Sequence, residues 1–379
     1  MNVPLLDLKA QYVTIREDVR VAVDRVLESQ RFVLGEQGQA LEADIARYCQ
    51  TEHAIACASG SDALLLALMS LGLKPGDEVV TTPFTFFATA AAVTRLGARP
   101  VFVDIDEETL NLNVGRVSEA ITQDTRAIIA VHLYGQCVEM NPLLQLGAER
   151  GIPIIEDAAQ AIGAEDRARR AGSMGTIGCL SFYPSKNLGA AGDGGMLVTN
   201  DANYATRLRK LHVHGEHQKY HHDEVGINSR LDEIQAAILR TKLPHLDEWT
   251  RERQRRAQNY DKLFTDAGLR EQVMVPFVRS DGRHVFHQYV IRVPGDARDK
   301  LRQHLRAQGI GCDVYYPVPL HLQNCFAYLG YACGDFPESE KAAGETMALP
   351  IYPELSQAQQ EYVVSSIADF FGDRPAGGQ

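Results

Sequence analysis

Short apolar runs alternate with amphipathic stretches along the first part of the chain. The apolar runs predict β-strands at residues 54–58, 78–81, 101–104, 127–131 and 154–157. Between them, apolar residues at helical spacing predict helices at residues 59–71, 114–121 and 142–149. Strands that alternate with helices are typical of a mostly parallel sheet with helices on both faces. The pattern therefore predicts an α/β fold.

Both ends of the chain depart from this alternation. Residues 1–50 carry apolar positions at helical intervals, interrupted by a turn at residues 31–35. Beyond residue 248, a charged helix leads into an alternating strand at residues 287–293 and then into two further helices. We therefore expect a large domain over residues 1–247, which includes the N-terminal helical segment, and a smaller α+β domain over residues 248–379. Residues 372–379 are expected to fray.

The composition limits the classes of partner and the location. The chain has 379 residues, of which 45% are hydrophobic and 23% are charged, and its net charge is −11. Because no basic stripe is present, nucleic acid is not expected as a partner. No apolar run reaches the length of a membrane span, and we expect no signal peptide. The seven cysteines are dispersed and form no C-x-x-C pair, which indicates reduced thiols and a cytoplasmic location. The cysteines and histidines also lack the spacing of metal ligands, so no metal site is expected.

Two candidate catalytic groups follow apolar runs that are close in the chain. Asp157 ends one run, and Lys186 lies between a second run and a glycine-rich loop. A lysine amine becomes a nucleophile near neutral pH when burial discourages its charge. An amine and a carboxylate presented together suit pyridoxal phosphate, because its aldehyde bonds to the amine and its ring nitrogen needs an anion to stay protonated.

A candidate phosphate site lies at residues 59–62 (Ser-Gly-Ser-Asp), which open a predicted helix. Hydroxyl groups and backbone N–H groups at a helix start can hold a phosphate. Plain N-capping by Ser59 or Ser61 is the alternative. The Asp157 and Lys186 runs that follow favour the phosphate of the same cofactor.

Several motifs occur together and in a fixed order. They are residues 157–160 (Asp-Ala-Ala-Gln), the stretch around Lys186, and residues 228–237 (Asn-Ser-Arg-Leu-Asp-Glu-Ile-Gln-Ala-Ala). They resemble the DegT/DnrJ/EryC1/StrS family of pyridoxal-phosphate-dependent nucleotide-sugar aminotransferases, and the likeness extends from residues 7–9 to residues 317–321. The resemblance implies fold type I, with a mostly parallel central sheet flanked by helices and a smaller C-terminal α+β domain.

The resemblance also implies how a cofactor is held. Lys186 would bond to the cofactor and move protons, and Asp157 would keep the ring nitrogen charged. The other implied contacts are Gly60, Ser61, Asp62, Phe86, Gln160, Ser181 and Asn228. Phe86 would stack on the ring and Gln160 would bind near its phenolic oxygen, whereas Phe84 and Phe87 are assigned to the core. Family members that remove a sugar hydroxyl carry histidine in place of Lys186, so lysine indicates an aminotransferase.

Asn228 has two possible roles. In the resembled family the matching asparagine reaches the cofactor phosphate of the partner subunit, which implies an obligatory homodimer. From the residues alone, Asn228 would cap a helix over residues 228–243 that ends at Pro244.

The resemblance implies a substrate as well. The expected reaction transfers an amino group, with L-glutamate as donor, to a nucleotide-linked keto-sugar in amino-sugar biosynthesis, with pyridoxamine phosphate as the half-reaction form. The nearest likeness is to enzymes for dTDP- or UDP-linked 3-keto-hexoses. Implied substrate contacts are Phe32, Tyr183, Arg230, Tyr315, Tyr316 and His321. A 4-keto-sugar or amino-cyclitol aminotransferase and a non-catalytic sensory protein that binds the cofactor remain alternatives, and residues 315–321 could also be a hinge without a ligand.

Three positions depart from the family pattern. Ala168 stands where a glycine-centred hairpin turn is usual, so the geometry of residues 166–170 stays open. Ser61 replaces a threonine but keeps the hydroxyl group, and Tyr315 stands where many members have histidine.

Overall fold

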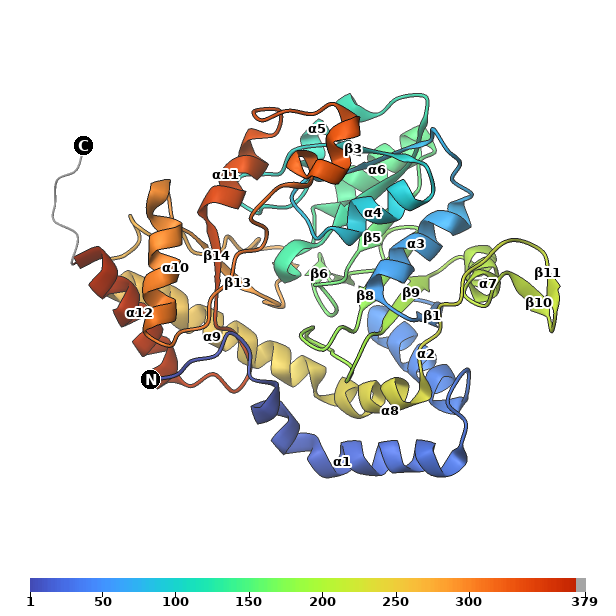
Figure 1. Ribbon diagram of the computed structural model, residues 1–379, viewed down its shortest axis with the longest axis horizontal. Coiled ribbons are helices and arrows are strands. Elements are labelled where there is room, and N and C mark those ends of the chain that lie inside the picture. Colours follow the sequence, from blue (N-terminus) through green and yellow to red (C-terminus); the bar gives the residue numbers. More distant parts are fainter. Residues whose placement is uncertain (373–379) are drawn as a thin grey trace.

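A single large sheet lies at the centre of the bigger part of the molecule (Figure 1). The computed structural model describes residues 1–372. Within them the sheet has seven strands, in the spatial order β1 (His53–Cys57), β9 (Gly195–Thr199), β8 (Ile177–Ser181), β5 (Ile154–Asp157), β4 (Thr125–Val131), β2 (Glu78–Thr81) and β3 (Arg99–Phe102). Neighbours from β8 to β3 are parallel, whereas β9 runs antiparallel to both β8 and β1. The prediction of a mostly parallel α/β sheet is confirmed.

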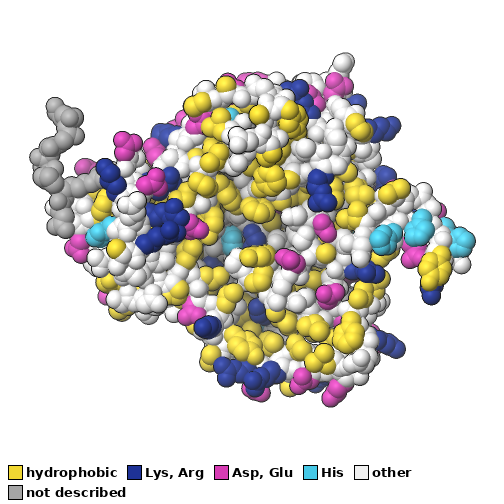
Figure 2. Space-filling view, viewed as in Figure 1, with side chains coloured by type: hydrophobic (Ala, Val, Ile, Leu, Met, Phe, Trp, Pro, Cys, Tyr) yellow, Lys and Arg dark blue, Asp and Glu magenta, His cyan; other side chains and the backbone are white. Residues whose placement is uncertain are grey.

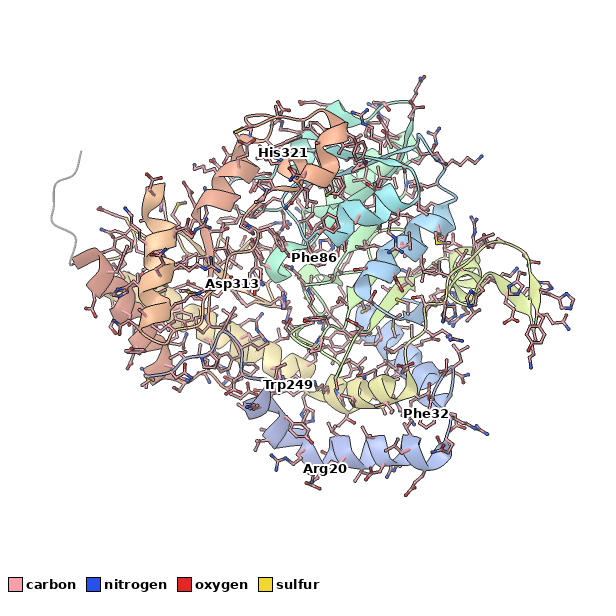
Figure 3. All side chains as sticks on the ribbon, in the orientation of Figure 1. Arg20, Phe32, Phe86, Trp249, Asp313 and His321 are labelled. Atoms are coloured by element: carbon pink, nitrogen blue, oxygen red, sulfur yellow. The ribbon has the colours of Figure 1, made fainter. Side chains whose placement is uncertain are left out.

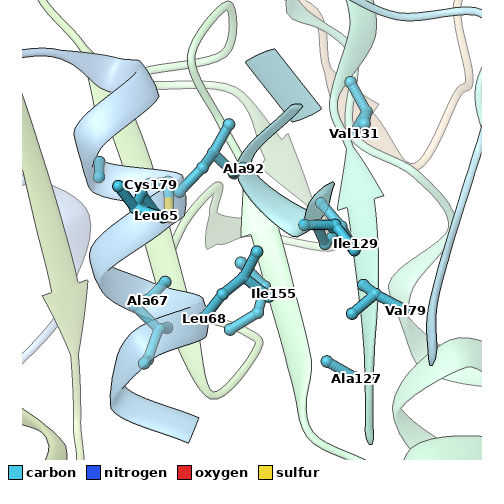
Figure 4. Close-up of a cluster of buried hydrophobic side chains, with 14 of the residues drawn as sticks. Leu65, Ala67, Leu68, Val79, Ala92, Ala127, Ile129, Val131, Ile155 and Cys179 are labelled. Carbon is cyan, nitrogen blue, oxygen red and sulfur yellow. The ribbon is translucent and has the colours of Figure 1, made fainter. Parts of the chain in front are cut away.

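Helices cover both faces of this sheet. One face packs against α3 (Gly60–Leu71), α4 (Ala88–Arg95) and α7 (Ala202–Leu211). The other face packs against α2 (Glu36–Cys49), α5 (Val114–Ala120), α6 (Met140–Arg150) and α8 (Glu233–Lys242). Alternate strand residues point to opposite faces, so Ile129 and Ile155 join the cluster around α3 (Figure 4) and Ile128 joins the cluster around α6. Burial on both sides explains why these strands are continuous apolar runs in the sequence.

A second hydrophobic core lies beside the sheet. There β13 (Tyr289–Arg292) pairs antiparallel with β14 (Thr346–Leu349), and the ribbon packs against α9 (Leu246–Asp266), α10 (Arg298–Ala307) and α12 (Gln357–Gly372). Val3 is fully buried in the same core and bridges to Ile310, so the first residues of the chain join its C-terminal part (Figure 1). The long helix α1 (Leu8–Ser29) then packs against α8 and Trp249.

The segment between α10 and β14 returns to the large sheet. Phe102 of β3 contacts Phe326 and Phe336, which lie around α11 (Pro337–Glu345) and the short helices η4 (Leu320–Leu322) and η5 (Asn324–Leu329). Further short helices are η1 (Leu133–Gly135), η2 (Leu243–His245) and η3 (Gly295–Ala297).

The hairpin at residues 165–170 forms without the usual glycine. β6 (Glu165–Asp166) pairs with β7 (Arg169–Arg170) and with β12 (Gly282–Arg283). The two turn residues, Arg167 and Ala168, have φ values of 51° and 65°. Such a turn favours Gly and Asn, since a Cβ is strained in the left-handed region. Asp166 is buried beside it and pairs with Arg279 at 3.0 Å.

The polar segment at residues 212–226 carries a small hairpin, β10 (Glu216–Gln218) and β11 (His221–His222), that projects from the large domain (Figure 1). Histidine side chains gather on it (Figure 2), and Tyr220 and Val225 are highly exposed there.

The predicted helix over residues 228–243 is wrong at its start. α8 begins at Glu233, and Asn228 instead forms a β-bridge with Val213. Ser229 explains the difference, because its hydroxyl donates to Asp62 at 2.7 Å and accepts from the Ala58 N–H at 3.0 Å. These distant partners hold the segment extended, so Asn228 caps no helix and its side chain is exposed.

Two searches of the described residues were negative. None of the helices within residues 1–372 combines the length and the apolarity that a membrane crossing needs. In the same range no three His, Cys, Asp or Glu side chains gather as metal ligands. The tail that we expected to fray is residues 372–379. Apart from Gly372, this tail lies outside the described residues.

Candidate active site

A cavity of about 560 Å³ opens at the carboxyl ends of β4, β5 and β8. Its wall contains many of the predicted site residues, namely Gly60, Ser61, Phe86, Asp157, Gln160, Ser181, Tyr183, Lys186, Tyr315 and Tyr316. β5 and β8 are parallel neighbours, so their carboxyl ends deliver Asp157 and the Lys186 loop to the same edge of the sheet. The amine and the acid therefore face one cavity.

Asp157 is a buried carboxylate with fixed partners. Thr89, on α4, donates its hydroxyl hydrogen to Asp157 Oδ2 at 2.8 Å, and the Ala159 N–H donates to Oδ1 at 3.2 Å. Burial raises the pKa of Asp157, and the Thr89 and Ala159 donors, together with the charge of Lys186, oppose that rise. An anion held in this way can keep a pyridine nitrogen protonated.

Lys186 lies in the loop that follows β8. Its backbone N–H donates to the Tyr183 carbonyl at 2.8 Å, which closes a turn at the start of the loop. Burial lowers the pKa of Lys186 to about 8, and the attraction of Asp157 partly opposes this shift. A substantial fraction of the side chain is then the neutral, nucleophilic amine near neutral pH.

The start of α3 has the shape of a phosphate site. Ser59 caps the helix by accepting from the Asp62 N–H at 3.1 Å, which confirms the capping alternative for Ser59 and leaves the Ser61 hydroxyl facing the cavity. A Cβ on Gly60 would lie 2.6 Å from Ser181 Cβ, so glycine is needed for the helix to approach β8 this closely. The first N–H groups of a helix lack intrahelical partners and concentrate positive potential. Ser61 of α3 and Ser181 of β8 therefore line the cavity together, beside a helix start of the kind that binds anions.

A chain of hydrogen bonds links Gln160 and Tyr316, two further residues of the cavity wall. The Tyr134 N–H donates to Gln160 Oε1 at 2.7 Å, and Gln160 Nε2 donates to the Tyr316 hydroxyl at 3.0 Å. Burial raises the pKa of Tyr316, so its phenol keeps its proton. Tyr316 also contacts Phe86, with ring centroids 6.1 Å apart. Phe86 is 55% exposed, as expected for a ring that a flat ligand could cover.

Five predicted site residues lie outside the cavity wall. Asp62 binds Ser229, and Asn228 is exposed beyond it. Phe32 lies at the turn before α2, in a separate hollow, and Figure 3 shows it far from Phe86. Arg230 is partly buried next to Ser229, and His321 is buried in η4, where its Nε2 lies 3.0 Å from Glu340.

Sequence reasoning missed Thr89, which bonds to Asp157 without lining the cavity, and the place of His287 in the cavity wall. Thr89 lies in an alanine-rich helix with nothing nearby to mark it as a partner of Asp157. His287 was placed in an alternating strand, yet β13 begins only at Tyr289 and His287 lines the cavity. His132 also lines the cavity, with Nε2 2.8 Å from Glu156 and Nδ1 accepting from the Val138 N–H.

Known proteins resemble this chain over nearly its whole length. A protein of Geobacillus stearothermophilus named "Pleiotropic regulatory protein" is 51% identical over 98% of this chain and 99% of its own. A UDP-N-acetyl-3-dehydro-alpha-D-glucosamine 3-aminotransferase of Acidithiobacillus ferrooxidans is 45% identical over 94% of this chain and 95% of its own.

Solved structures agree with the fold. DesV of S. venezuelae, in complex with a ketimine intermediate, superposes with a TM-score of 0.94 at 42% identity and covers 99% of both chains. NtdA of Bacillus subtilis, with bound cofactor PMP, has a TM-score of 0.90 at 30% identity and covers 98% of this chain and 86% of its own. Together with the cavity, these findings confirm the predicted fold class, an aminotransferase activity and the pyridoxal phosphate cofactor. The family model for these enzymes matches residues 13–368, and the chain belongs to the DegT/DnrJ/EryC1/StrS aminotransferase family.

Proposed function

We propose that this enzyme aminates carbon 3 of a UDP- or dTDP-linked keto-hexose for amino-sugar biosynthesis, with L-glutamate as the amino donor. The observation that carries the proposal is the shared cavity of Lys186 and Asp157, in a chain 45% identical to a relative named for a UDP-linked 3-keto-sugar. The family resemblance of the residues around Lys186 supports the same class of substrate.

Residues of the cavity have separate proposed roles toward the cofactor. Pyridoxal phosphate supplies an aldehyde that takes up the amino group and a ring that accepts the electrons left by deprotonation. Lys186 Nζ would bond to that aldehyde and, once released, carry the proton to and from the reacting carbon. Asp157 would pair with the ring nitrogen and Gln160 with the phenolic oxygen. Gly60, Ser61, Asp62 and Ser181 would hold or support the phosphate, and Phe86 would cover the ring.

We further propose that the working form is a homodimer in which Asn228 serves the partner's phosphate. Asn228 is exposed and precedes Ser229, whose hydroxyl bonds to Asp62 in the first turn of α3. Arginine is absent from the cavity wall that residues 1–372 form, and Lys186 is its one lysine. A nucleotide diphosphate and glutamate carboxylates need cations, so a second subunit that contributes Arg230 or a neighbouring cation would complete the site.

The dimer can be tested by making hybrid dimers. Co-expression of Lys186→Ala and Asn228→Ala chains should give more activity than the two variants assayed apart, since one site of each hybrid has both intact groups. If the hybrids are no more active than the separate variants, Asn228 serves its own subunit and the proposal is wrong.

We also propose the domain division at residues 247 and 248 and a cytoplasmic location. All seven cysteines are free in the structure, and five of them are buried, which suits a reducing compartment. The remaining substrate contacts, Phe32, Tyr183, Tyr315, Tyr316 and His321, stay proposals drawn from the family resemblance.

The deciding experiment is a substrate panel. Purified enzyme would be mixed with glutamate and with UDP- or dTDP-linked 3-keto and 4-keto hexoses, while spectra and products are recorded. Conversion of a 3-keto sugar to its amine supports the proposal, and exclusive use of 4-keto sugars contradicts it. A protein that binds the cofactor without turnover, which would suit the regulatory name of the Geobacillus relative, predicts instead a bound chromophore that no keto-sugar changes after glutamate treatment.

A further inference from the structure

His287 is held at the cavity by an unusual piece of backbone. Phe286 has φ of 44°, a left-handed conformation that is rare for a bulky residue. The Val285 N–H donates to the Gly135 carbonyl at 2.9 Å, and Arg253, buried on α9, donates to the Phe286 carbonyl at 3.0 Å. The segment is therefore fixed from both domains. Strain of this kind persists only where surrounding contacts enforce it, and it is found preferentially at ligand sites.

The hydrogen bonds of Asn187 fix the tautomer of His287. Asn187 Nδ2 donates to the Val285 carbonyl at 3.0 Å, and a carbonyl can only accept, so Oδ1 is the atom that faces His287 Nδ1 at 3.2 Å. Since Oδ1 also can only accept, the hydrogen must be on His287 Nδ1. A neutral imidazole carries one hydrogen, so Nε2 is left as an acceptor. Burial and the charges of Lys186 and Arg253 lower the pKa of His287 well below its ordinary value, in keeping with the neutral ring.

Most other buried acceptors around the cavity already have donors, although within residues 1–372 Gln288 Oε1 is a second acceptor without a hydrogen-bond partner. Asp157 accepts from Thr89 and from Ala159, and Gln160 Oε1 accepts from Tyr134. His132 uses both ring nitrogens, one toward Glu156 and one toward a backbone N–H. Among residues 1–372, no group donates to His287 Nε2, although the ring lines the cavity and is only half-buried. The described part of the protein thus fixes His287 Nε2 as an acceptor and provides no hydrogen-bond donor for it.

We propose that His287 Nε2 accepts a hydrogen bond from a hydroxyl or amide N–H on the sugar carbon next to the carbonyl that is aminated. The inference rests on the proposed function and narrows its substrate class: the preferred keto-sugar carries a donor beside the ketone and is not deoxygenated there. Lys186 must reach the reacting carbon to move its proton, and His287 is hydrogen-bonded to Asn187, the residue that follows Lys186. A substituent on the sugar carbon next to the reacting carbon would therefore lie within reach of His287.

Two variants separate this role from a structural one. His287→Asn keeps a donor for Asn187 but removes the acceptor at the Nε2 position, whereas His287→Gln keeps an acceptor near that position and loses the Nδ1 donor. Binding of nucleotide-linked amino-sugar products would be measured by calorimetry, with pairs that differ only by the hydroxyl next to the amine. The wild type should prefer the hydroxylated member by about tenfold, the value of one ordinary hydrogen bond. His287→Asn should lose this preference, and His287→Gln should keep most of it.

Several results would overturn the inference. One is an unchanged preference in His287→Asn, and another is an equal loss in both variants, which would assign His287 a structural role. Nitrogen-15 spectra of histidine-labelled protein without cofactor give an independent readout, since a hydrogen found on Nε2 contradicts the assigned tautomer. Failure of the proposed function would be recognised separately: glutamate alone would then leave the spectrum of the wild-type holoenzyme unchanged. A normal glutamate response without any hydroxyl preference would reject only the His287 inference.

Discussion

Replacing Thr89 by valine removes one hydrogen bond from the buried acid and changes almost nothing else in size. The Thr89 hydroxyl has one hydrogen, which goes to Asp157 at 2.8 Å. The Thr85 hydroxyl, 3.0 Å from Thr89, must then be the donor in that pair. Both threonines are buried, so no solvent can replace the missing donor at low energy.

The magnitude follows from the charge of the acceptor. A hydrogen bond to a charged group contributes about 1.5–3 kcal/mol, and 1.36 kcal/mol corresponds to one pKa unit. Thr89→Val should therefore raise the pKa of Asp157 still further above its ordinary value, which burial already makes it exceed. A raised carboxyl pKa in the folded state is a penalty on the ionised form. The penalty is present near neutral pH and fades as the pH falls through the folded pKa toward 3.8.

Urea unfolding of the cofactor-free protein measures this directly. Near neutral pH the variant should be less stable than wild type by about 1.5–3 kcal/mol, and the difference should shrink in mildly acid solution. Thr89→Ser is the matched control, because it keeps the hydroxyl and loses only a methyl group. If Thr89→Val destabilises the protein by the same amount at every pH, the loss comes from packing or from the hydrogen bond with Thr85, and the assigned support of Asp157 is wrong.

Further predictions concern the nucleophile, its basicity and the hairpin. Lys186→Ala should abolish transamination and the visible absorbance of the lysine-bound cofactor, and wild-type turnover in this variant would contradict the assignment. In cofactor-free enzyme, the rate at which Lys186 captures pyridoxal phosphate should rise with pH and level off above about 8, because only the neutral amine reacts. Asp157→Asn should move the midpoint of this pH dependence to lower pH, because the variant loses the negative charge that attracts the lysine. Ala168→Gly should stabilise the protein by about 1 kcal/mol in urea unfolding, since the left-handed φ of 65° strains alanine but not glycine; an unchanged midpoint would show that the turn is not strained.

The sequence was informative where burial and local chemistry act together. The run that ends at Asp157 is apolar because β5 is buried on both faces, and the same burial perturbs the carboxylate. The helix predicted at residues 59–71 ends where Gly72 takes the left-handed conformation, with φ of 73°. Ser61 and Ser181, both expected as cofactor contacts, line one cavity because a helix start and a strand end meet there.

What the sequence did not predict has one physical cause: these segments bond to residues that are far away in the sequence. Ser229 bonds to Asp62, so the segment at Asn228 is extended although its residues suit a helix. The turn at Phe286 depends on Arg253 and on the Gly135 carbonyl, and no local pattern announces it. The direction of β9 also depends on its neighbours, since a short apolar run fits a parallel or an antiparallel strand equally well.

The site also explains why the cofactor and the fold should depend on one another. In the free protein, burial penalises the charge of Lys186 and that of Asp157, and their mutual attraction compensates only in part. Bonding to the cofactor aldehyde would make the lysine nitrogen less basic, and a protonated ring nitrogen would give the carboxylate an oppositely charged partner. The cofactor would therefore relieve penalties that the cofactor-free fold must carry. The same burial that makes the apoprotein less stable is what makes Lys186 nucleophilic, so replacing either group to stabilise the fold would remove the chemistry for which the cavity is built.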